Sequence, residues 1–319
     1  MLKYTFQRIL ALILTLIIIL TIAFLVIRMM PGSIYENAEE TMSPEMVKVL
    51  EAKYHMNEPI IVQYRIFLQN VIIKGDWGTS LVIQPKVDVW EILKSKIPVT
   101  LSLNIVSLFI ALPIGILAGI ISAIRRNSKL DYFISLLVVI FISVPSFVFA
   151  TLLQYFFGFK FGWFPIIYDS MAAGNVKYLS MILPIMALSF SPIARVTRYL
   201  RGELIESLNS EYMLLARTKG LTQFQATVRH AMRNSFLPLA NIIIPMFTNV
   251  LMGSLVVEKI FAVAGVGGLL VKSINSNDHS LTIAILIFYS MVSLLTILIV
   301  DLSYGIIDPR VRVGGGKNE

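Results

Sequence analysis

Long apolar runs alternate with polar segments along the whole chain. The first apolar run covers residues 9–27, and five more runs without Asp, Glu, Lys or Arg cover residues 97–124, 132–159, 178–194, 234–257 and 279–300. Each run is long enough for one membrane crossing, because about 20 residues of α-helix span a bilayer. The pattern predicts an all-α integral membrane fold with six transmembrane helices and both termini on the same side.

The run at residues 9–27 is also compatible with a secretory signal peptide. However, it is longer than a typical signal core, and no cleavage site of small residues follows it before Arg28. We therefore interpret it as the first transmembrane helix.

Residues 31–96 are polar and long enough to form a small helical subdomain after that helix. Ser43 and Pro44 predict the start of a short helix that reaches about His55, because Ser is a favourable N-cap and Pro fits the first turn. A second helix with a broad apolar face should begin after Pro59.

The end of this subdomain contains a turn and one more helix. The sequence Gly-Asp-Trp-Gly-Thr-Ser at residues 75–80 predicts the turn, and residues 87–93 predict a third short helix that leads to Pro98.

Residues 195–238 form the only long polar segment in the second half of the chain. They contain seven basic and three acidic residues. Apolar positions at three- and four-residue spacing predict one helix over residues 204–219, and Gly220 suits the left-handed position that ends a helix. Thr222 and Gln225 form a capping-box pattern for a second helix. The segment therefore predicts a helix–glycine–helix hairpin. The apolar positions expected on its second helix are Phe224, Val228, Ala231 and Met232.

Two interpretations of this hairpin remain open from the residues alone. Its apolar faces could rest on the protein's own helices or on anionic lipid, as in an ordinary basic loop. Alternatively, the hairpin could be a docking site for a cytoplasmic partner.

The composition excludes several other kinds of protein. With 56% hydrophobic and 14% charged residues and a mean hydropathy of +0.78, the chain is far more apolar than a soluble domain. It contains no cysteine, and its three histidines lie in unrelated segments, so no metal site is expected. No phosphate-binding loop of the ATPase type is present. No charged residue lies deep in an apolar run, which argues against a proton- or sodium-coupled carrier.

The distribution of charge predicts the orientation. The segments expected on the N-terminal side hold the entire net charge of +8, whereas the segments on the other side sum to zero. Because cytoplasmic loops carry the excess of Lys and Arg, we expect a multi-pass protein of the cell membrane with both termini and residues 195–238 in the cytoplasm. Residues 31–96 are then extracytoplasmic.

Polar side chains within the apolar runs are candidates for a translocation path. Hydroxyl and amide groups at membrane depth commonly form hydrogen bonds between helices, and this is the simpler interpretation of any single one. Together they indicate a wet pathway. The candidate path residues are Ser143, Ser146, Ser189, Ser191 and Asn249.

The segment after the fifth run is expected to form an outer loop. It contains a glycine-rich sequence that could re-enter between helices, because glycine permits close backbone approach; an ordinary mobile turn is the alternative.

Four sequence features together resemble permeases of ABC importers. Residues 216–222 (Ala-Arg-Thr-Lys-Gly-Leu-Thr) with 230–234 (His-Ala-Met-Arg-Asn) are similar to the coupling loop in the oligopeptide, dipeptide and nickel branch. The turn at residues 75–80, the segment at residues 258–270 and the C-terminal sequence at residues 301–312 are similar to the same family in the same order. The segment at residues 258–270 resembles the outer-gate loop of that family, so the resemblance implies a gate whose candidate residues are Glu258, Gly265, Gly267 and Gly268. The chain resembles the first, or B-type, membrane subunit of an oligopeptide permease.

The chain departs from the general importer pattern at three positions. Leu214 stands where a glutamate is expected, Leu215 stands in place of the first alanine, and Ala264 stands in place of a proline in the gate segment. Glu211 is the stand-in for the missing acid. The resemblance implies that the residues that couple the permease to its ATPases are Glu211, Tyr212, Leu215, Ala216, Arg217, Lys219, Gly220 and Leu221.

The resemblance also implies the assembly. It implies a homologous second permease, two cytoplasmic ATPase subunits that bind ATP and Mg, and an extracytoplasmic peptide-binding protein. The chain itself would be a non-catalytic subunit in the lipid bilayer, without a bound cofactor or nucleic acid. Its cargo would be oligopeptides; dipeptides, nickel or another small solute are the alternative.

The predicted domain organisation follows from these assignments. Residues 1–30 contain the N-terminus and the first transmembrane helix, and residues 31–96 form the extracytoplasmic helical subdomain. Residues 97–312 form the transporter transmembrane domain of type I importers, which includes the coupling loop at 195–238, and residues 313–319 form a tail.

Overall fold

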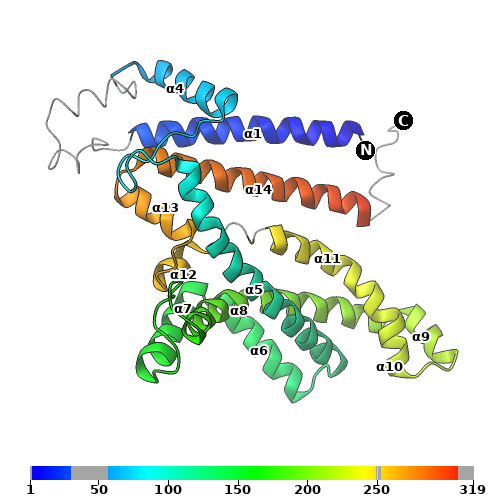
Figure 1. Ribbon diagram of the computed structural model, residues 1–319. Coiled ribbons are helices and arrows are strands. Elements are labelled where there is room, and N and C mark those ends of the chain that lie inside the picture. The colour runs from blue at the N-terminus through cyan, green and yellow to red at the C-terminus, as the bar shows by residue number, and fades with distance from the viewer. Residues whose placement is uncertain (1, 30–56, 249, 251–252, 308–319) are drawn as a thin grey trace. The chain divides into compact units, whose positions relative to one another are not determined.

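The computed structural model describes residues 2–29, 57–248, 250 and 253–307, and its described elements are helices joined by loops (Figure 1). The helix predicted at residues 43–55, the path candidate Asn249, and the C-terminal sequence and tail from Asp308 onward lie outside the described residues.

The chain forms two compact units, each of which we describe by itself. Unit 1 contains Met1–Val99 and Ala264–Leu295, and unit 2 contains Thr100–Val263 and Thr296–Glu319.

Unit 1 is built around two long apolar helices and the segment that follows the first of them. Its elements are α1 (Leu2–Met29), α4 (Ile60–Leu68), the π-helical η1 (Gln69–Lys74), the start of α5 (Val89–Ile124), α13 (Val266–Asn275) and most of α14 (His279–Ile307).

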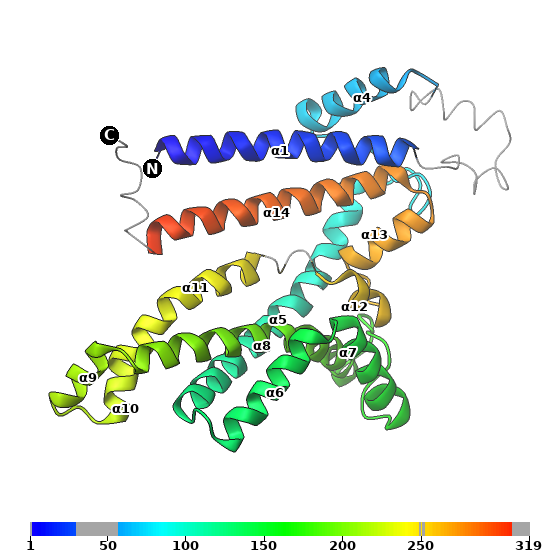
Figure 2. The same ribbon diagram turned by 180° about the vertical axis from the view of Figure 1, so that it is seen from behind.

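Helix α4 lies along the second half of α1, as two opposite views show (Figures 1 and 2). The Tyr64 hydroxyl lies 2.5 Å from the Thr21 hydroxyl. The Phe24 ring is 5.4 Å from the Tyr64 ring and 5.2 Å from the Phe67 ring. The predicted apolar helix after Pro59 is confirmed, and part of its apolar face packs on α1. Ile60, Ile61, Ile72 and Ile73 remain exposed.

The turn at residues 75–80 is also confirmed, because Gly75 and Gly78 have φ angles of 64° and 87°. Only glycine adopts this region at little cost. Ser80 ends the turn with a buried hydrogen bond of 2.5 Å to the carboxylate of Asp278, which immediately precedes α14. The same carboxylate accepts hydrogen bonds from the backbone N–H groups of Val82 and Ile83 at 3.2 and 3.1 Å. The motif therefore fastens the loop of residues 75–83 to the start of α14.

The short helix predicted at residues 87–93 is not separate. It forms the first part of α5, which continues through Pro98 as one helix of 36 residues. Proline in a helix removes a single backbone hydrogen bond, and the long apolar helix around it keeps the others.

Unit 2 holds most of the remaining helices. They are the rest of α5, α6 (Lys129–Ser143), α7 (Ser146–Leu153), η2 (Gln154–Lys160), α8 (Asn175–Leu208), α9 (Glu211–Thr218), α10 (Gln223–Ala226), η3 (Thr227–Ala231), α11 (Met232–Thr248) and α12 (Leu255–Ile260). Helix α8 packs against α6, α7 and α11.

Helices α5 and α8 pack closely because of two glycines one turn apart. A Cβ atom added at Gly115 would lie 2.9 Å from the Val196 Cβ, and one added at Gly119 would lie 3.1 Å from the Leu200 Cβ. The Thr197 hydroxyl also donates a hydrogen bond of 3.1 Å to the Gly115 carbonyl. Small residues at four-residue spacing are a common device for close helix packing in membranes.

Among the described residues, four helical segments are long and apolar enough to cross a membrane. They are Thr5–Met29, Val89–Ile124, Asn175–Leu208 and His279–Ser303. A fifth crossing exists if the pair formed by Lys129–Ser143 and Ser146–Lys160 counts as one span.

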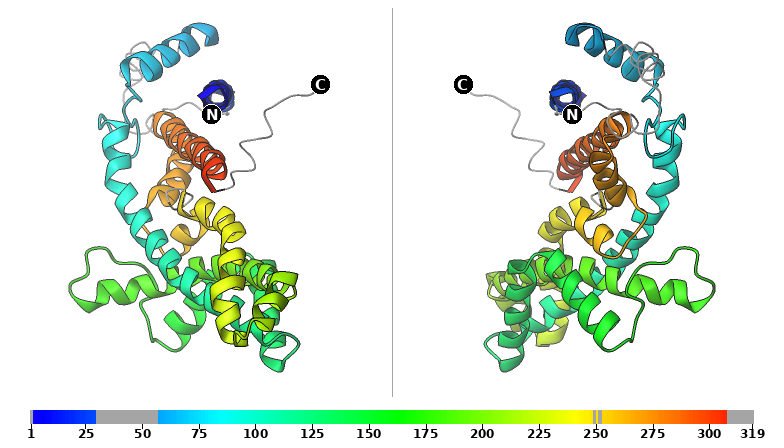
Figure 3. Two further views of the ribbon diagram at one scale, coloured as in Figure 1. Left: turned by 90° about the vertical axis from the view of Figure 1, so that its right-hand side faces the viewer. Right: turned by 90° about the vertical axis from the view of Figure 1, so that its left-hand side faces the viewer.

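The prediction of one helix at residues 132–159 is wrong, because that pair is bent by 103°. Val144 at the bend is extended, with φ −88° and ψ 124°. The ring of Pro145 disfavours a helical conformation at the preceding residue, which explains the break. Beyond the bend, η2 and the loop after it project to one side of unit 2 (Figure 3).

The prediction of one helix at residues 234–257 is also wrong. Helix α11 begins at Met232 and ends at Thr248, and α12 begins separately at Leu255. Gly253 between them has φ +60°, and the Ser254 side chain caps the next helix. The left-handed glycine is not helical, and the N-cap that follows it starts a new helix.

Candidate functional site

The polar segment of residues 195–238 folds as a hairpin at one end of unit 2, which we call the basic hairpin. Helix α8 leads into it, α9 and α10 lie side by side at its tip, and the chain returns through η3 and α11 (Figures 1 and 2). The predicted helix–glycine–helix arrangement is confirmed.

The tip of the basic hairpin turns at Gly220, whose φ is +88°. Its N–H donates a hydrogen bond of 3.0 Å to the Arg217 carbonyl, which closes the end of α9. The predicted capping box starts α10: the Gln225 N–H donates to the Thr222 hydroxyl at 3.3 Å, and the Thr222 N–H donates to the Gln225 side chain at 3.1 Å. The turn is fixed from both sides.

The prediction of one helix over residues 204–219 is wrong. Helix α8 ends at Leu208, and α9 begins at Glu211. The side chains between them bond to the preceding turn, with Asn209 donating to the Ile205 carbonyl at 2.9 Å and Ser210 donating to the Ser207 carbonyl at 2.6 Å. Such local hydrogen bonds compete with helix continuation, and they let α9 fold back.

A small apolar core holds the hairpin together and ties it to α5. The buried residues of this core come from five elements, so the tip is anchored to the helix bundle. They are Ala123, Leu204, Met213, Ala216, Ala226 and Ala231. Alanine at three of the contacts on α9, α10 and η3 permits these short helices to approach closely.

Polar groups reinforce this core at the base of α9. The hydroxyls of Ser207 and Tyr212 are hydrogen bonded, and Ser207 also donates to the Ala231 carbonyl at 3.2 Å. Burial raises the pKa of the Tyr212 phenol, but hydrogen bonding with Ser207, Ser210 and Asn234 outweighs burial and leaves that pKa below its ordinary value. The contact joins α8, α9 and η3.

The outer face of the tip is apolar and exposed. Leu214, Leu215 and Phe224 are 66%, 56% and 75% exposed, and the side chains of Tyr212 on α9 and Val228 on η3 are also exposed. Several exposed apolar side chains on neighbouring short helices are typical of a docking site. Arg217 and Lys219 add exposed cations to the tip.

The structure separates the sequence-predicted coupling residues into two groups. Ala216 is buried and Leu221 is half-buried, so they support the tip from within. The others are exposed at the tip: Glu211, Tyr212, Leu215, Arg217, Lys219 and Gly220. The sequence marked Leu214 only as a departure from the importer pattern, but its side chain is exposed at the tip like those of the exposed coupling residues.

The predicted apolar stripe of the second helix is wrong in part. Phe224 and Val228 are exposed, whereas Ala231 is buried. Ala226 and Thr227 face the core in their place, because the capping box and the π-helical η3 change the angular spacing of this segment.

An ion pair behind the hairpin was not identified from the sequence. Arg201 of α8 binds the carboxylate of Asp131 at the start of α6, with Nε 2.7 Å from Oδ1 and Nη2 2.8 Å from Oδ2. Ser122 of α5 donates to the same carboxylate, and so does the Asn127 N–H at 2.9 Å. The pair therefore joins α5, α6 and α8 at the base of the hairpin.

The predicted path residues do not form one cluster. Ser189 is buried and donates to the carbonyls of Ser107 and Ile185 at 3.1 and 2.7 Å, which is the arrangement of a helix-packing hydroxyl. Ser143 lines a cavity of about 360 Å³ between α6 and α8. Ser146 and Ser191 are half-buried.

A larger open cavity of about 730 Å³ lies between α8 and α11 of unit 2. Its wall combines charged side chains of α8 with apolar side chains of α11, including Pro245 and Met246. The sequence could have indicated this wall only through Arg195, Arg198 and Glu203, which recur along one side of α8 at three- to five-residue spacing.

Glu258 of the candidate gate is almost completely buried in unit 2, with 2% of its surface exposed. The Thr100 hydroxyl donates to its Oε1 at 2.9 Å. A Cβ atom at Gly253 would lie only 2.6 Å from that oxygen and 2.7 Å from the Thr100 Cγ2. Both the positive φ and the lack of space require glycine at this position.

The three gate glycines belong to unit 1, where they open α13. Gly265 precedes the helix with an extended backbone, and Gly267 and Gly268 lie in its first turn. Glu258 therefore belongs to unit 2, whereas these glycines belong to unit 1.

The described residues contain no group of three or more His, Asp or Glu side chains that is able to hold a metal ion.

Comparisons with known proteins place these features in context. A family model described as "Binding-protein-dependent transport system inner membrane component" matches residues 115–313, and its N-terminal companion model matches residues 1–104.

Curated relatives match over nearly the whole chain. A dipeptide transport system permease protein of Lactococcus lactis is 38% identical over 98% of this chain and 100% of its own length. An oligopeptide transport system permease protein of Escherichia coli is 36% identical, also over 98% of this chain and 100% of its own length.

One solved structure, titled as an amino acid ABC transporter with histidines, covers 68% of this chain and 97% of its own chain. It has a TM-score of 0.50 and 20% sequence identity, and it supports the fold alone.

Proposed function

The chain belongs to the family of binding-protein-dependent transport system inner membrane components, and on this basis we propose that it is a permease subunit of an ATP-driven peptide importer. The observation that carries the proposal is the match to dipeptide and oligopeptide permeases along their full length. The apolar tip of the basic hairpin gives this assignment a physical basis.

Peptides are the proposed cargo. Relatives from different bacteria at 35–38% identity are all described as dipeptide or oligopeptide permeases. We propose that the chain forms the translocation path together with a homologous second permease, and that an extracytoplasmic binding protein delivers the peptide. The 730 Å³ cavity beside α8 is large enough to contribute to such a path.

The basic hairpin is the proposed contact with the ATPase subunits. Leu214, Leu215 and Phe224 would fill an apolar groove, and Arg217 and Lys219 would lie at its rim. An apolar centre with a charged rim is the usual composition of a protein interface. ATP and Mg would be bound by the partner subunits.

The base of the hairpin is suited to pass motion into the membrane. The Asp131–Arg201 pair joins three helices, and the Gly115 and Gly119 contacts hold α5 against α8. Closely packed helices move as rigid bodies rather than by continuous deformation. A displacement of the tip would therefore tilt α5, α6 and α8 together.

The finer topology is part of the same proposal. We propose six membrane crossings, with the bent pair α6–α7 and the segment of α11 as the two that do not form long straight helices. The cytoplasmic position of both termini rests on the charge distribution. Residues 31–96 would then be extracytoplasmic.

The proposed gate involves Glu258 and the glycines that open α13. The Glu258 carboxylate is buried beside Gly253, a position that has no room for a side chain, so this part of the chain is rigid. A rigid segment is suited to keep the gate closed. Ser143, Ser146, Ser191 and Asn249 stay candidate path residues, whereas Ser189 is better explained by helix packing.

Purification of the tagged chain from its native membrane tests the proposal. We expect a second permease and two ATPases to copurify, and we expect proteoliposomes with ATP and the binding protein to take up a labelled tripeptide. Equal uptake without ATP would contradict the proposal, and so would uptake of nickel but not of peptide.

A further inference from the structure

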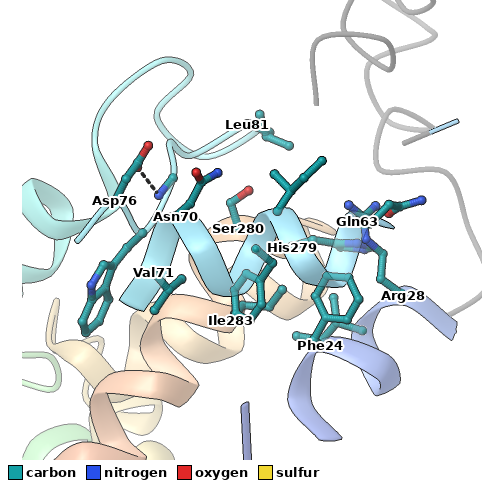
Figure 4. A pocket seen from close by; sticks show the side chains of 15 residues that line it. Phe24, Arg28, Gln63, Asn70, Val71, Asp76, Leu81, His279, Ser280 and Ile283 are labelled. Carbon is teal, nitrogen blue, oxygen red and sulfur yellow. Dashed lines mark hydrogen bonds between the residues drawn. The ribbon is translucent and has the colours of Figure 1, made fainter. Parts of the chain in front are cut away.

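Unit 1 contains an amphipathic pocket that the transport proposal does not use. It has a volume of about 160 Å³ and lies between α1, the α4–η1 helix, the turn after η1 and the start of α14 (Figure 4). We call it the α1–α14 pocket. Its wall contains Phe24, Ile27, Ile66, Phe67, Val71, Trp77 and Ile283, together with a few polar side chains.

The polar groups are not spread evenly around the pocket. Figure 4 shows Arg28, Gln63 and His279 at one end, and Asn70 and Asp76 at the other. The Asp76 carboxylate accepts a hydrogen bond of 2.8 Å from the Gly78 N–H, so it belongs to the turn. The end with Arg28 is therefore the end suited to an anionic group.

Arg28 is held in place by its neighbours. Its guanidinium lies 5.7 Å from the centre of the Phe24 ring, a cation–π contact that directs it along the pocket wall. The Nδ1 atom of His279 is buried and has no hydrogen-bond partner among the described residues. A buried polar nitrogen without a hydrogen-bond partner costs folding free energy. A ligand oxygen that forms a hydrogen bond with this nitrogen would remove that cost.

The position of the pocket along α1 identifies the kind of ligand. The apolar run of α1 ends at Ile27, Arg28 follows at once, and the candidate span of α14 begins at His279. Both polar groups therefore lie where the hydrocarbon region gives way to headgroups. Trp77 also lines the pocket, and tryptophan is enriched at membrane–water interfaces.

The turns of α1 just before Arg28 also carry exposed apolar side chains. They are Ile22, Leu25 and Val26. The cavity is large enough for a phosphate with its glycerol backbone, and acyl chains would extend from it into the hydrocarbon region, where α1 presents apolar side chains. A phosphate anion, a glycerol and two acyl chains together describe one class of molecule.

We propose that the α1–α14 pocket binds one phospholipid of the leaflet in which α1 ends, with its phosphate on Arg28 and His279. Guanidinium and imidazole groups form strong charge-assisted hydrogen bonds with phosphate oxygens. The bound lipid would hold α4 against α1 and α14, because all three line the pocket. The proposal is independent of the cargo and of the direction of transport.

The test measures lipid binding to the full-length chain, purified in detergent with the subunits that copurify. Phosphatidylglycerol is the probe, and native mass spectrometry counts the lipids retained. We expect the wild-type assembly to hold one lipid that Ile283→Trp loses, because the indole fills the pocket. Arg28→Gln should weaken binding of that lipid about tenfold, the loss expected for one charge-assisted contact.

Matched controls separate this lipid from lipids bound elsewhere. Lys74→Gln removes an exposed cation at the end of η1, outside the pocket, and should leave the retained lipid unchanged. Ile73→Trp adds an indole on the exposed side of η1 and should also have no effect. Diacylglycerol, which lacks the phosphate, should not be retained.

Three results would overturn the proposal. Equal retention of diacylglycerol would show that the phosphate is not recognised. Displacement of the lipid by inorganic phosphate alone would identify a free-anion site, and displacement by a tripeptide would identify a peptide site. If Arg28→Gln fails to fold, the comparison of the two lipids on the wild-type assembly and on Ile283→Trp still decides the question.

Discussion

Arg201 binds both carboxylate oxygens of Asp131, at 2.7 and 2.8 Å, across the interface between α8 and α6. Asp131 is 1% exposed, and its carboxylate also accepts from Ser122 and from the Asn127 N–H. A single carboxylate thus organises the base of the basic hairpin.

Asp131→Asn should destabilise the protein by about 2 kcal/mol, because it leaves the guanidinium without its counter-charge. The loss is below the range for a fully buried pair, since the Arg201 side chain is 31% exposed and partly screened. Thermal unfolding in detergent measures the loss. Arg125→Gln, at an exposed position in the same loop region, is the control and should change little. Unchanged stability of Asp131→Asn would show that the pair does not hold the base together.

Gly220→Ala should reduce ATP-dependent uptake, because a Cβ in the left-handed region costs about 1–2 kcal/mol and shifts the tip of the hairpin. Gly220→Pro should abolish uptake while the chain still inserts into the membrane. The control is Gly162→Ala, since Gly162 also has a positive φ of +63° and open space around it but lies outside the hairpin. Normal uptake by Gly220→Pro would contradict a coupling role for this turn.

Leu215→Asp and Phe224→Asp should release the ATPase subunits without loss of fold stability. Both side chains are exposed, so the folded chain loses little, whereas a carboxylate in an apolar groove is costly for the complex. Copurification measures the loss, which should exceed tenfold in affinity, or about 1.4 kcal/mol. Met171→Asp, at an exposed methionine in a loop, is the control. If the tip variants retain the ATPases as the control does, the tip is not the docking surface.

Gly253→Ala should impair transport more than Gly174→Ala. Both glycines have φ +60°, but a Cβ at Gly253 meets the Glu258 carboxylate at 2.6 Å, whereas Gly174 has nothing within 4 Å. The difference between the two variants therefore isolates the crowding at Glu258 from the backbone strain they share. ATP hydrolysis per transported peptide is the measurement, and we expect this ratio to rise for Gly253→Ala. Equal ratios would argue against a role of Glu258 in the gate.

Single cysteines test the orientation directly, because the chain contains none of its own. A cysteine at Met171 should react with a membrane-impermeant thiol reagent added outside intact cells, and one at Gln223 should react only after the cells are opened. Both positions are exposed, so access to the reagent depends on the side of the membrane. Labelling of Gln223→Cys from outside would reverse the proposed topology.

The sequence predicted best where the chemistry is local. The turn at Gly220 and the capping box of Thr222 and Gln225 depend on neighbouring residues, and all were predicted from them. The breaks at Val144 and Asn209 were missed, although Pro145 and Ser210 provide the local signal, because a long apolar or periodic run obscured it.

Long-range partners could not be predicted from one sequence. Asp131 and Arg201 are 70 positions apart, and Ser80 and Asp278 are 198 positions apart. In the sequence, each of these four residues resembles an ordinary loop or surface residue. The spacing of residues in one chain does not show which distant group will be the partner of each. Likewise, the exposure of Phe224 depends on where α9 and η3 pack, which helical periodicity alone does not determine.

The close contact of Gly115 and Gly119 with Val196 and Leu200 limits the kinds of motion available to α5 and α8. A Cβ atom added at either glycine would lie only about 3 Å from the opposing side chain, so lengthwise sliding that brought a larger residue to these positions would cause a collision. The two helices would move as one rigid body when the hairpin is displaced. Larger residues at these glycines would change how hairpin motion is passed to the membrane helices, although neither peptide nor nucleotide contacts these positions.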